Sequence, residues 1–117
     1  MALIVECPCP EDEVHKHGII EVNDQGKVTS FLEKPLASET KSRSQSPCFY
    51  FLDEGCLKLL DDFLEQNKNE PLEKKDATGN FLAFLIPKAF VFTYKTKGRY
   101  DVGNLTSYKY CLKNFTK

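Results

Sequence analysis

The sequence has no excess of charge of either sign, and this absence excludes some functions. Among its 117 residues, 16 lysines and arginines face 17 aspartates and glutamates, which gives a net charge of −1. A nucleic-acid-binding domain would need a basic face to neutralise phosphates, so we expect no nucleic-acid partner. Hydrophobic residues make up 41% of the chain, enough for a core. The length suits one small domain over 1–117.

Long apolar runs are also missing. The longest uncharged apolar stretch, 81–87, is far too short to cross a bilayer, so we expect no membrane partner. The apolar residues 1–5 lack the basic region and the long hydrophobic segment of a signal peptide. The five cysteines are odd in number and irregularly spaced, unlike those of a disulfide-stapled secreted domain. These features predict reduced thiols in a cytoplasmic protein.

Four soft ligands for zinc lie within a short stretch of the sequence. They are Cys7, Cys9, His15 and His17. Zinc fingers space their paired ligands at C-x₂₋₄-C and H-x₃₋₅-H, whereas a single residue separates each pair here. Pro8 also stiffens the first pair. The spacing favours the other interpretation, a mobile polar loop over 7–17 that carries two histidines.

The first half of the sequence predicts a strand, a hairpin, a loop and another strand. The apolar run at 2–6 is typical of a buried strand. The segments 18–22 and 27–33 flank an Asn-Asp-Gln-Gly turn and form a hairpin. The polar segment 34–46, with four serines, predicts an exposed loop. The aromatic run at 48–52 predicts a core strand.

Three helices and one strand are expected in the second half. Asp53 is a suitable N-cap for a helix to about Asn67. Its apolar face consists of Leu57, Leu60, Phe63 and Leu64. A second helix ends before Pro87, and a strand follows at 89–96; the apolar residues of that helix are Phe81, Leu82 and Leu85. Asn104 caps the last helix, whose stripe is Leu105, Tyr108, Leu112 and Phe115.

An acid and a base stand side by side at the end of the expected hairpin, in the segment Phe31-Leu-Glu-Lys-Pro35. Adjacent residues on a strand point to opposite faces, so Glu33 and Lys34 contact one ligand only if the chain twists there. Pro35 restricts Lys34 to an extended geometry and stops the strand. Taken alone, the pair is an ordinary strand end with solvated charges.

Asp101 is a second candidate, a single acid between Tyr100 and Val102 and followed by Gly103. Mg²⁺ is typically held by one or two carboxylates together with substrate phosphate, so Asp101 is a possible metal ligand. The other interpretation is that Asp101 orders the turn into the last helix by accepting hydrogen bonds from backbone N–H groups.

In their order along the chain, these segments resemble the sugar nucleotidyltransferases, which make nucleotide sugars from a nucleoside triphosphate and a sugar 1-phosphate. Within that family, the segments resemble those of glucose-1-phosphate thymidylyl- and uridylyltransferases. The resemblance covers 18–115 and is carried by Gly18-Ile-Ile-Glu-Val…Gly26-Lys-Val…Phe31-Leu-Glu-Lys-Pro35 and by Tyr100-Asp-Val-Gly-Asn104. It implies an α/β fold, the mixed-sheet second half of a Rossmann-like nucleotide-diphospho-sugar transferase.

The resemblance also implies a role for each candidate residue. The acid that matches Glu33 holds sugar hydroxyls, and the lysine that matches Lys34 binds the sugar phosphate as a point charge. Tyr50 is expected beside them, at a surface concavity. The acid that matches Asp101 holds Mg²⁺ together with a second aspartate. In the reaction, the sugar phosphate attacks the α-phosphorus and releases pyrophosphate, through positioning and charge neutralisation.

The sequence departs from the family pattern at three places. It has no match to the Gly-x-Gly-x-Arg loop that binds the triphosphate, nor to the partner aspartate for Mg²⁺. Cys48 stands where the family usually has a small residue, often glycine, and Arg99 where tryptophan is common. The chain therefore resembles only the sugar-binding second half, and we expect it to be inactive alone and to bind Mg²⁺ poorly.

Two functions follow from the resemblance. The first is the sugar-1-phosphate-binding part of a sugar nucleotidyltransferase, which pairs with a missing N-terminal half. The alternative is a non-catalytic binding or assembly module that kept the fold and lost the activity. Nine phenylalanines, five tyrosines and little net charge predict a homodimer, because a cut sheet exposes edges and apolar faces. The expected contacts are the strand at 2–6 and the helix at 104–115.

Overall fold

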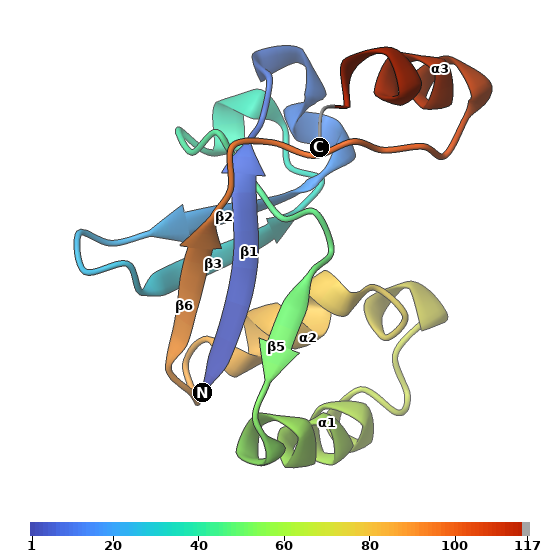
Figure 1. Ribbon diagram of the computed structural model, residues 1–117. Coiled ribbons are helices and arrows are strands. Elements are labelled where there is room, and N and C mark those ends of the chain that lie inside the picture. Colours follow the sequence, from blue (N-terminus) through green and yellow to red (C-terminus); the bar gives the residue numbers. More distant parts are fainter. Residues whose placement is uncertain (116–117) are drawn as a thin grey trace.

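A central strand organises the sheet in the computed structural model, which describes residues 1–115. Strand β1 (Ala2–Pro8) pairs antiparallel with β5 (Tyr50–Leu52) and parallel with β6 (Val91–Lys95) (Figure 1). The predicted strand at 2–6 is confirmed and extends through Pro8. Because β1 has neighbours on both sides, it cannot add a second copy along its edge, and the dimer contact expected at this strand stays a prediction.

The predicted hairpin is confirmed and forms the other part of the sheet. Strands β2 (Gly18–Val22) and β3 (Val28–Glu33) pair antiparallel around the expected turn. The two-residue strand β4 (Ser44–Gln45) joins this hairpin to β1, because Gln45 is opposite both Cys7 and Ile19. The strand order is β3-β2-β4-β1-β5, with β6 also on β1. This mixed sheet confirms the predicted α/β class.

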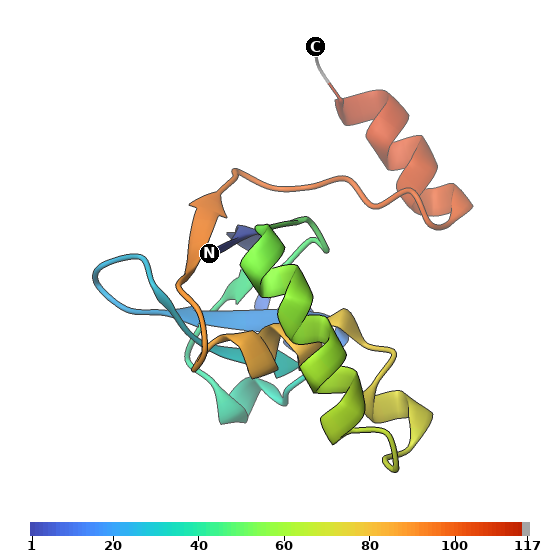
Figure 2. The ribbon, with the colours of Figure 1, turned by 90° about the horizontal axis from the view of Figure 1, so that it is seen from below.

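Three α-helices complete the fold. Helices α1 (Glu54–Gln66) and α2 (Thr78–Leu85) pack together behind the sheet, whereas α3 (Leu105–Asn114) stands away from the body (Figure 2). The predicted N-caps are confirmed, since Asp53 accepts a hydrogen bond from Cys56 N and Asn104 accepts one from Ser107 N. The side chains at the centre of the core are Ile4, Ile20, Val28, Leu82, Leu85 and Val91.

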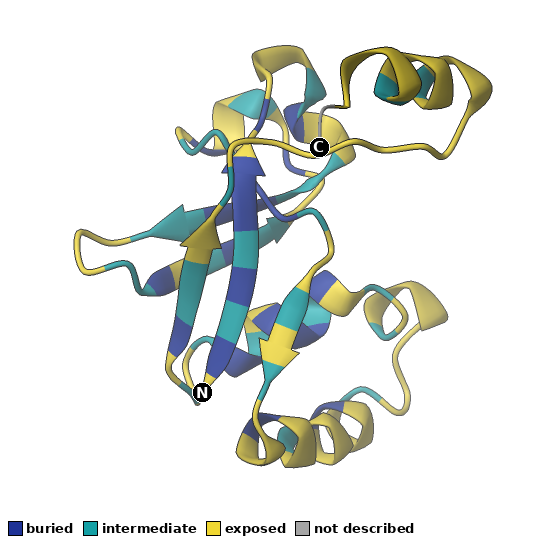
Figure 3. Cartoon of the chain, in the orientation of Figure 1, coloured by how far each residue is buried: buried dark blue, intermediate teal, exposed yellow. Residues whose placement is uncertain are grey.

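Much of the apolar surface predicted to be core is exposed instead (Figure 3). Phe63 is buried on α1, but Leu57 is 51% exposed and Leu64 44% exposed. The apolar face predicted for α1 is therefore only partly right, because the buried residues of this helix are Cys56 and Phe63. Phe51, in a strand expected to be core, is 56% exposed. In Figure 1, no helix among residues 1–115 lies over the front of β1, β5 and β6.

Two segments predicted as polar loops are ordered by local contacts. Residues Glu11–Lys16 form a 3₁₀ helix, η1, because Val14 is buried with Cys9 and Ile19. A second 3₁₀ helix, η2 (Ala37–Glu39), lies in the predicted exposed loop, and a third, η3 (Leu72–Lys74), lies in the charged segment before α2. The predicted mobile loop over 7–17 is therefore wrong, because one apolar side chain anchors it.

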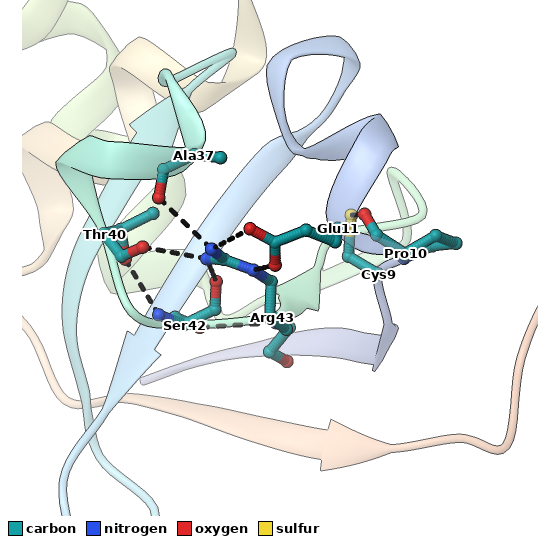
Figure 4. A network of polar contacts seen from close by, with 8 residues as sticks. Cys9, Pro10, Glu11, Ala37, Thr40, Ser42 and Arg43 are labelled. Atoms are coloured by element: carbon teal, nitrogen blue, oxygen red, sulfur yellow. Dashed lines mark hydrogen bonds and ion pairs between the residues drawn. The ribbon is translucent and has the colours of Figure 1, made fainter.

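A single arginine connects these loop segments (Figure 4). Arg43 donates hydrogen bonds to the Glu11 carboxylate from Nη2, at 2.9 Å from Oε1, and from Nε. Its other donors reach the carbonyl oxygens of Ala37, Thr40 and Ser42. The network ties η1, η2 and β4 together beside the hairpin. The predicted exposed loop over 34–46 is therefore only partly exposed.

The cysteines form no disulfide among the residues described, 1–115. All five cysteines are free thiols. Cys7 and Cys9 are buried, and the residues described, 1–115, bring no three histidine, cysteine, aspartate or glutamate side chains together as a metal site. None of the helices within those residues is long and apolar enough to cross a membrane.

Candidate functional site

Glu33 and Lys34 occupy the end of β3, as predicted. Glu33 is the last residue of the strand and pairs with Gly18 of β2. Lys34 has a φ of 49°, so its backbone is left-handed, and the extended geometry predicted from Pro35 is wrong. The turn allows Lys34 N to donate a hydrogen bond to His17 O at 3.0 Å. Such a conformation costs about 1–3 kcal/mol for a residue with a side chain, so the surrounding structure must impose it.

The Glu33 side chain lies against the start of α2. A Cβ atom on Gly79, the second residue of that helix, would stand 2.2 Å from Glu33 Oε2. The same position would be 2.5 Å from Phe31 Cε1. Only a glycine at position 79 leaves room for the carboxylate here. A negative charge beside the first turn of a helix is favoured by the helix dipole.

Tyr50 lies in β5, which β4 and β1 separate from the hairpin in the order of the sheet. It is half-buried in β5 and pairs with Ile4 of β1. Burial raises the pKa of Tyr50 to about 12, and the negative charge of Glu33 contributes to the increase. Tyr50 therefore stays a neutral phenol, able both to donate and to accept a hydrogen bond. The expected position of Tyr50 beside Glu33 and Lys34 stays a prediction.

Cys48 precedes Tyr50 in a strained turn. Its φ is 62°, a left-handed conformation in which a residue without a Cβ atom is favoured. Cys48 N donates a hydrogen bond to Ser46 Oγ at 3.3 Å, and the thiol is exposed. This geometry gives a physical reason for glycine in the family at this position.

Asp101 lies in the extended segment between β6 and α3. Its Oδ1 accepts a hydrogen bond from Gly103 N at 2.9 Å, as the turn-ordering interpretation predicts. Its Oδ2 is 4.0 Å from Arg99 Nη2. That same nitrogen of Arg99 is 3.1 Å from His17 Nδ1. Lys34 and Asp101 are therefore both connected to His17, one through its backbone and the other through Arg99.

A cavity of about 760 Å³ opens between η1 and α3 around these groups. Its wall includes Lys16, His17, Arg99, Asp101 and Ser107. A second cavity of about 810 Å³ shares Asp101 and is bordered by aromatic side chains, which are Phe49, Phe51, Tyr94 and Tyr100. Glu33, Lys34 and Tyr50 line neither of these two cavities. The concavity expected around Glu33 and Lys34 therefore stays a prediction.

The sequence analysis gave no role in a binding site for a sugar phosphate to three residues that the structure brings into polar surroundings or close contacts. Gly79 had no signal, since a glycine early in a helix is unremarkable in one sequence. Glu6 is buried and accepts hydrogen bonds from Thr93 Oγ1, at 3.1 Å, and from Ser44 Oγ, beside a cavity of about 580 Å³. Glu6 was missed because it ends the apolar run at 2–6, which predicts only a buried strand. His17 was noticed only as a possible zinc ligand, whereas its ring contacts Arg99.

Asp101 fits poorly as a metal ligand in this chain. Its two oxygens face a backbone N–H and a guanidinium, and it belongs to no group of three or more histidine, cysteine, aspartate or glutamate side chains among residues 1–115. Mg²⁺ keeps a near-octahedral oxygen shell and repels neighbouring cations. We therefore assign no reaction step to a metal held by this chain.

Comparisons with known proteins place the chain in a family. The model of the nucleotidyl transferase family matches residues 2–117. A glucose-1-phosphate adenylyltransferase of Granulibacter bethesdensis is 29% identical over 115 residues, covering 85% of this chain and 27% of that protein. The chain thus spans about a quarter of the length of this curated relative.

Solved structures show the same fold. The UTP-bound UGPase of Acinetobacter baumannii superposes with a TM-score of 0.73 at 19% identity, covering 96% of this chain and 38% of that one. A UDP-glucose pyrophosphorylase complexed with UDP-glucose gives a TM-score of 0.72 at 20% identity, covering 97% and 45%. These likenesses confirm the predicted Rossmann-like fold. The chain belongs to the nucleotidyl transferase family, among relatives that are sugar nucleotidyltransferases, as its sequence motifs predict.

Proposed function

We propose that this chain is the sugar-1-phosphate-binding part of a sugar nucleotidyltransferase. The observation that supports this most is the position of Glu33 at the end of β3, with its carboxylate against the first turn of α2. The carboxylate of Glu33 offers acceptors to sugar hydroxyls, and the neutral phenol of Tyr50 would add a donor. Lys34 follows Glu33 directly, and its ammonium group is the proposed partner of the phosphate on the same sugar. The substrate class is therefore a hexose 1-phosphate such as glucose 1-phosphate.

The proposed role of the chain is to bind and orient this substrate. In the family reaction, a sugar phosphate oxygen attacks the α-phosphorus of a nucleoside triphosphate and pyrophosphate leaves. Lys34 would reduce the charge repulsion between the two phosphate groups, and Glu33 would fix the orientation of the sugar. Both residues would contact the sugar phosphate itself, so we expect the chain to bind it without a nucleotide.

We propose further that the chain does not turn over by itself and binds Mg²⁺ and nucleoside triphosphate weakly. No Gly-x-Gly-x-Arg loop occurs in its sequence, and Asp101 supplies a single carboxylate. Pairing with a polypeptide that carries a triphosphate-binding loop would supply what is missing. The five free thiols are compatible with a cytoplasmic location, where thiols stay reduced.

Titration with glucose 1-phosphate, followed by two-dimensional NMR of the backbone amides, tests the proposal. We expect the largest shifts around Glu33, Lys34 and Tyr50, with binding that is weak and saturable. Chemical-shift changes centred instead on the cavity beside Glu6, or the absence of any saturable change, would contradict the proposed function. Release of pyrophosphate by the chain alone, in the presence of Mg²⁺ and a triphosphate, would contradict the proposed inactivity.

A further inference from the structure

One carboxylate and one guanidinium form a pair at the position where a metal ion would be expected. Asp101 Oδ2 and Arg99 Nη2 are 4.0 Å apart, and Asp101 Oδ1 is occupied by the N–H of Gly103 at 2.9 Å. The Asp101 side chain is 65% exposed, whereas that of Arg99 is 26% exposed. Arg99 is therefore the more buried partner, and its guanidinium is a positive charge next to the Asp101 carboxylate.

His17 holds the arginine in place. Arg99 Nη2 lies 3.1 Å from His17 Nδ1, so the ring accepts a hydrogen bond from the guanidinium at this nitrogen. His17 Nε2 is 3.5 Å from Glu13 Oε2 and 3.4 Å from the same nitrogen of Arg99. The side chain of His17 is only 17% exposed. Glu13, His17 and Arg99 thus form a chain of contacts from η1 to the segment that carries Asp101.

This arrangement has an electrostatic consequence for any cation at Asp101. An arginine keeps its positive charge in proteins, so the guanidinium remains charged next to the carboxylate. A divalent ion bound to Asp101 would lie within a few ångströms of it. In water, with physiological salt, repulsion over that distance corresponds to about tenfold in affinity. The pair also neutralises Asp101 without any ion.

We propose that Arg99, positioned by His17, is the built-in counter-ion of Asp101 and excludes divalent cations from it. In this account Asp101 and Arg99 act as a neutral pair that fixes the segment 96–104 against η1, rather than as a metal site. The inference goes beyond the proposed binding of sugar phosphate and does not depend on it, because it concerns groups that lie apart from Glu33.

Mn²⁺, a paramagnetic divalent ion, is the probe for this proposal. Broadening of backbone amide signals around Asp101 would be measured during titration of the full chain and of Arg99→Gln. We expect Arg99→Gln to bind Mn²⁺ about tenfold more tightly than the unmodified chain. Arg99→Lys, which keeps the charge, should remain as weak as the unmodified chain. The double variant with Asp101→Asn should lose the gain.

Lys97→Gln is the matched control, because Lys97 is an exposed cation two residues before Arg99. It removes the same charge from the same segment and should change Mn²⁺ affinity much less. Equal affinities for the unmodified chain and Arg99→Gln would overturn the proposal. A gain in Lys97→Gln as large as that in Arg99→Gln would also overturn it. Retained amide dispersion in each variant shows that it is folded, and binding of glucose 1-phosphate is scored separately.

Discussion

The carboxylate of Glu33 lies so close to Gly79 that a Cβ atom at position 79 would stand 2.2 Å from Glu33 Oε2. The end of β3 and the start of α2 are therefore in direct contact, although 46 positions of sequence numbering separate the two residues. The absence of a side chain at position 79 is what allows Glu33 to lie there. This relationship connects the packing of the helix to the orientation of the proposed sugar ligand.

Gly79→Ala should therefore destabilise the protein. Overpacking typically costs about 1–3 kcal/mol, which exceeds the gain of about 1 kcal/mol from the better helix propensity of alanine. We expect the free energy of unfolding, measured by urea denaturation, to fall by up to about 2 kcal/mol. Gly55→Ala in α1 is the control, since its Cβ would be 3.4 Å from Asp53 Oδ1, an ordinary contact. A stabilised Gly79→Ala would show that Glu33 does not need this space.

Cys48 provides a second test through its backbone. At a φ of 62°, a β-branched residue is far less tolerated than glycine. We expect Cys48→Val to be less stable than Cys48→Gly by about 1–2 kcal/mol in urea denaturation. If the two variants were equally stable, the left-handed turn before β5 would not exist in solution.

The ion pair of Glu11 with Arg43 predicts a pH dependence. The hydrogen bonds from Arg43 hold the pKa of Glu11 below its usual value of 4.5. The stability that this pair contributes is therefore complete above that usual value and is lost as the pH falls through the lower pKa of the folded state. Glu11→Gln should remove this part of the acid destabilisation between pH 5 and pH 3.

Urea denaturation at several pH values would measure the effect. Glu73→Gln, on η3 and outside the Arg43 network, is the control and should keep the pH dependence of the unmodified chain. If the free energy of unfolding of Glu11→Gln fell with decreasing pH as much as that of the unmodified chain, this role for the pair would be ruled out.

The hairpin, the caps at Asp53 and Asn104, and the order of elements could be predicted from sequence because they depend on local signals. Turn residues and capping side chains act over a few positions, and the structure confirms them. The side of α1 that is buried depends on where β5 leaves the sheet, and no local pattern contains that information. The exposed position of Phe51 follows from the same tertiary arrangement.

The candidate site was predictable only in part. Glu33 and Lys34 were located by a motif, which names residues but not their geometry. The left-handed conformation of Lys34 depends on its hydrogen bond to His17 O, a residue 17 positions earlier. The contact of Arg99 with His17 joins two segments far apart in sequence. Such contacts are set by the fold as a whole.

The exposed helix α3 predicts self-association. Its apolar stripe is uncovered, with Leu105 and Leu112 each 66% exposed and Tyr108 48% exposed. We expect a homodimer that buries on the order of 1,000 Å² or more in total through this helix. Light scattering at micromolar concentration should give the dimer mass for the unmodified chain and the monomer mass for Leu112→Glu. Lys113→Glu, next to it on α3, should remain dimeric, and a monomeric unmodified chain would contradict the prediction.

The central claim is that Lys34 binds the phosphate of a sugar 1-phosphate, and its most direct test is the dissociation constant for glucose 1-phosphate. Calorimetry or NMR titration would compare the unmodified chain with Lys34→Ala and with Lys58→Ala, a control at an exposed lysine that pairs with Glu54 on α1. We predict weak binding by the unmodified chain and by Lys58→Ala, and no detectable binding by Lys34→Ala. Undiminished binding by Lys34→Ala would contradict the account.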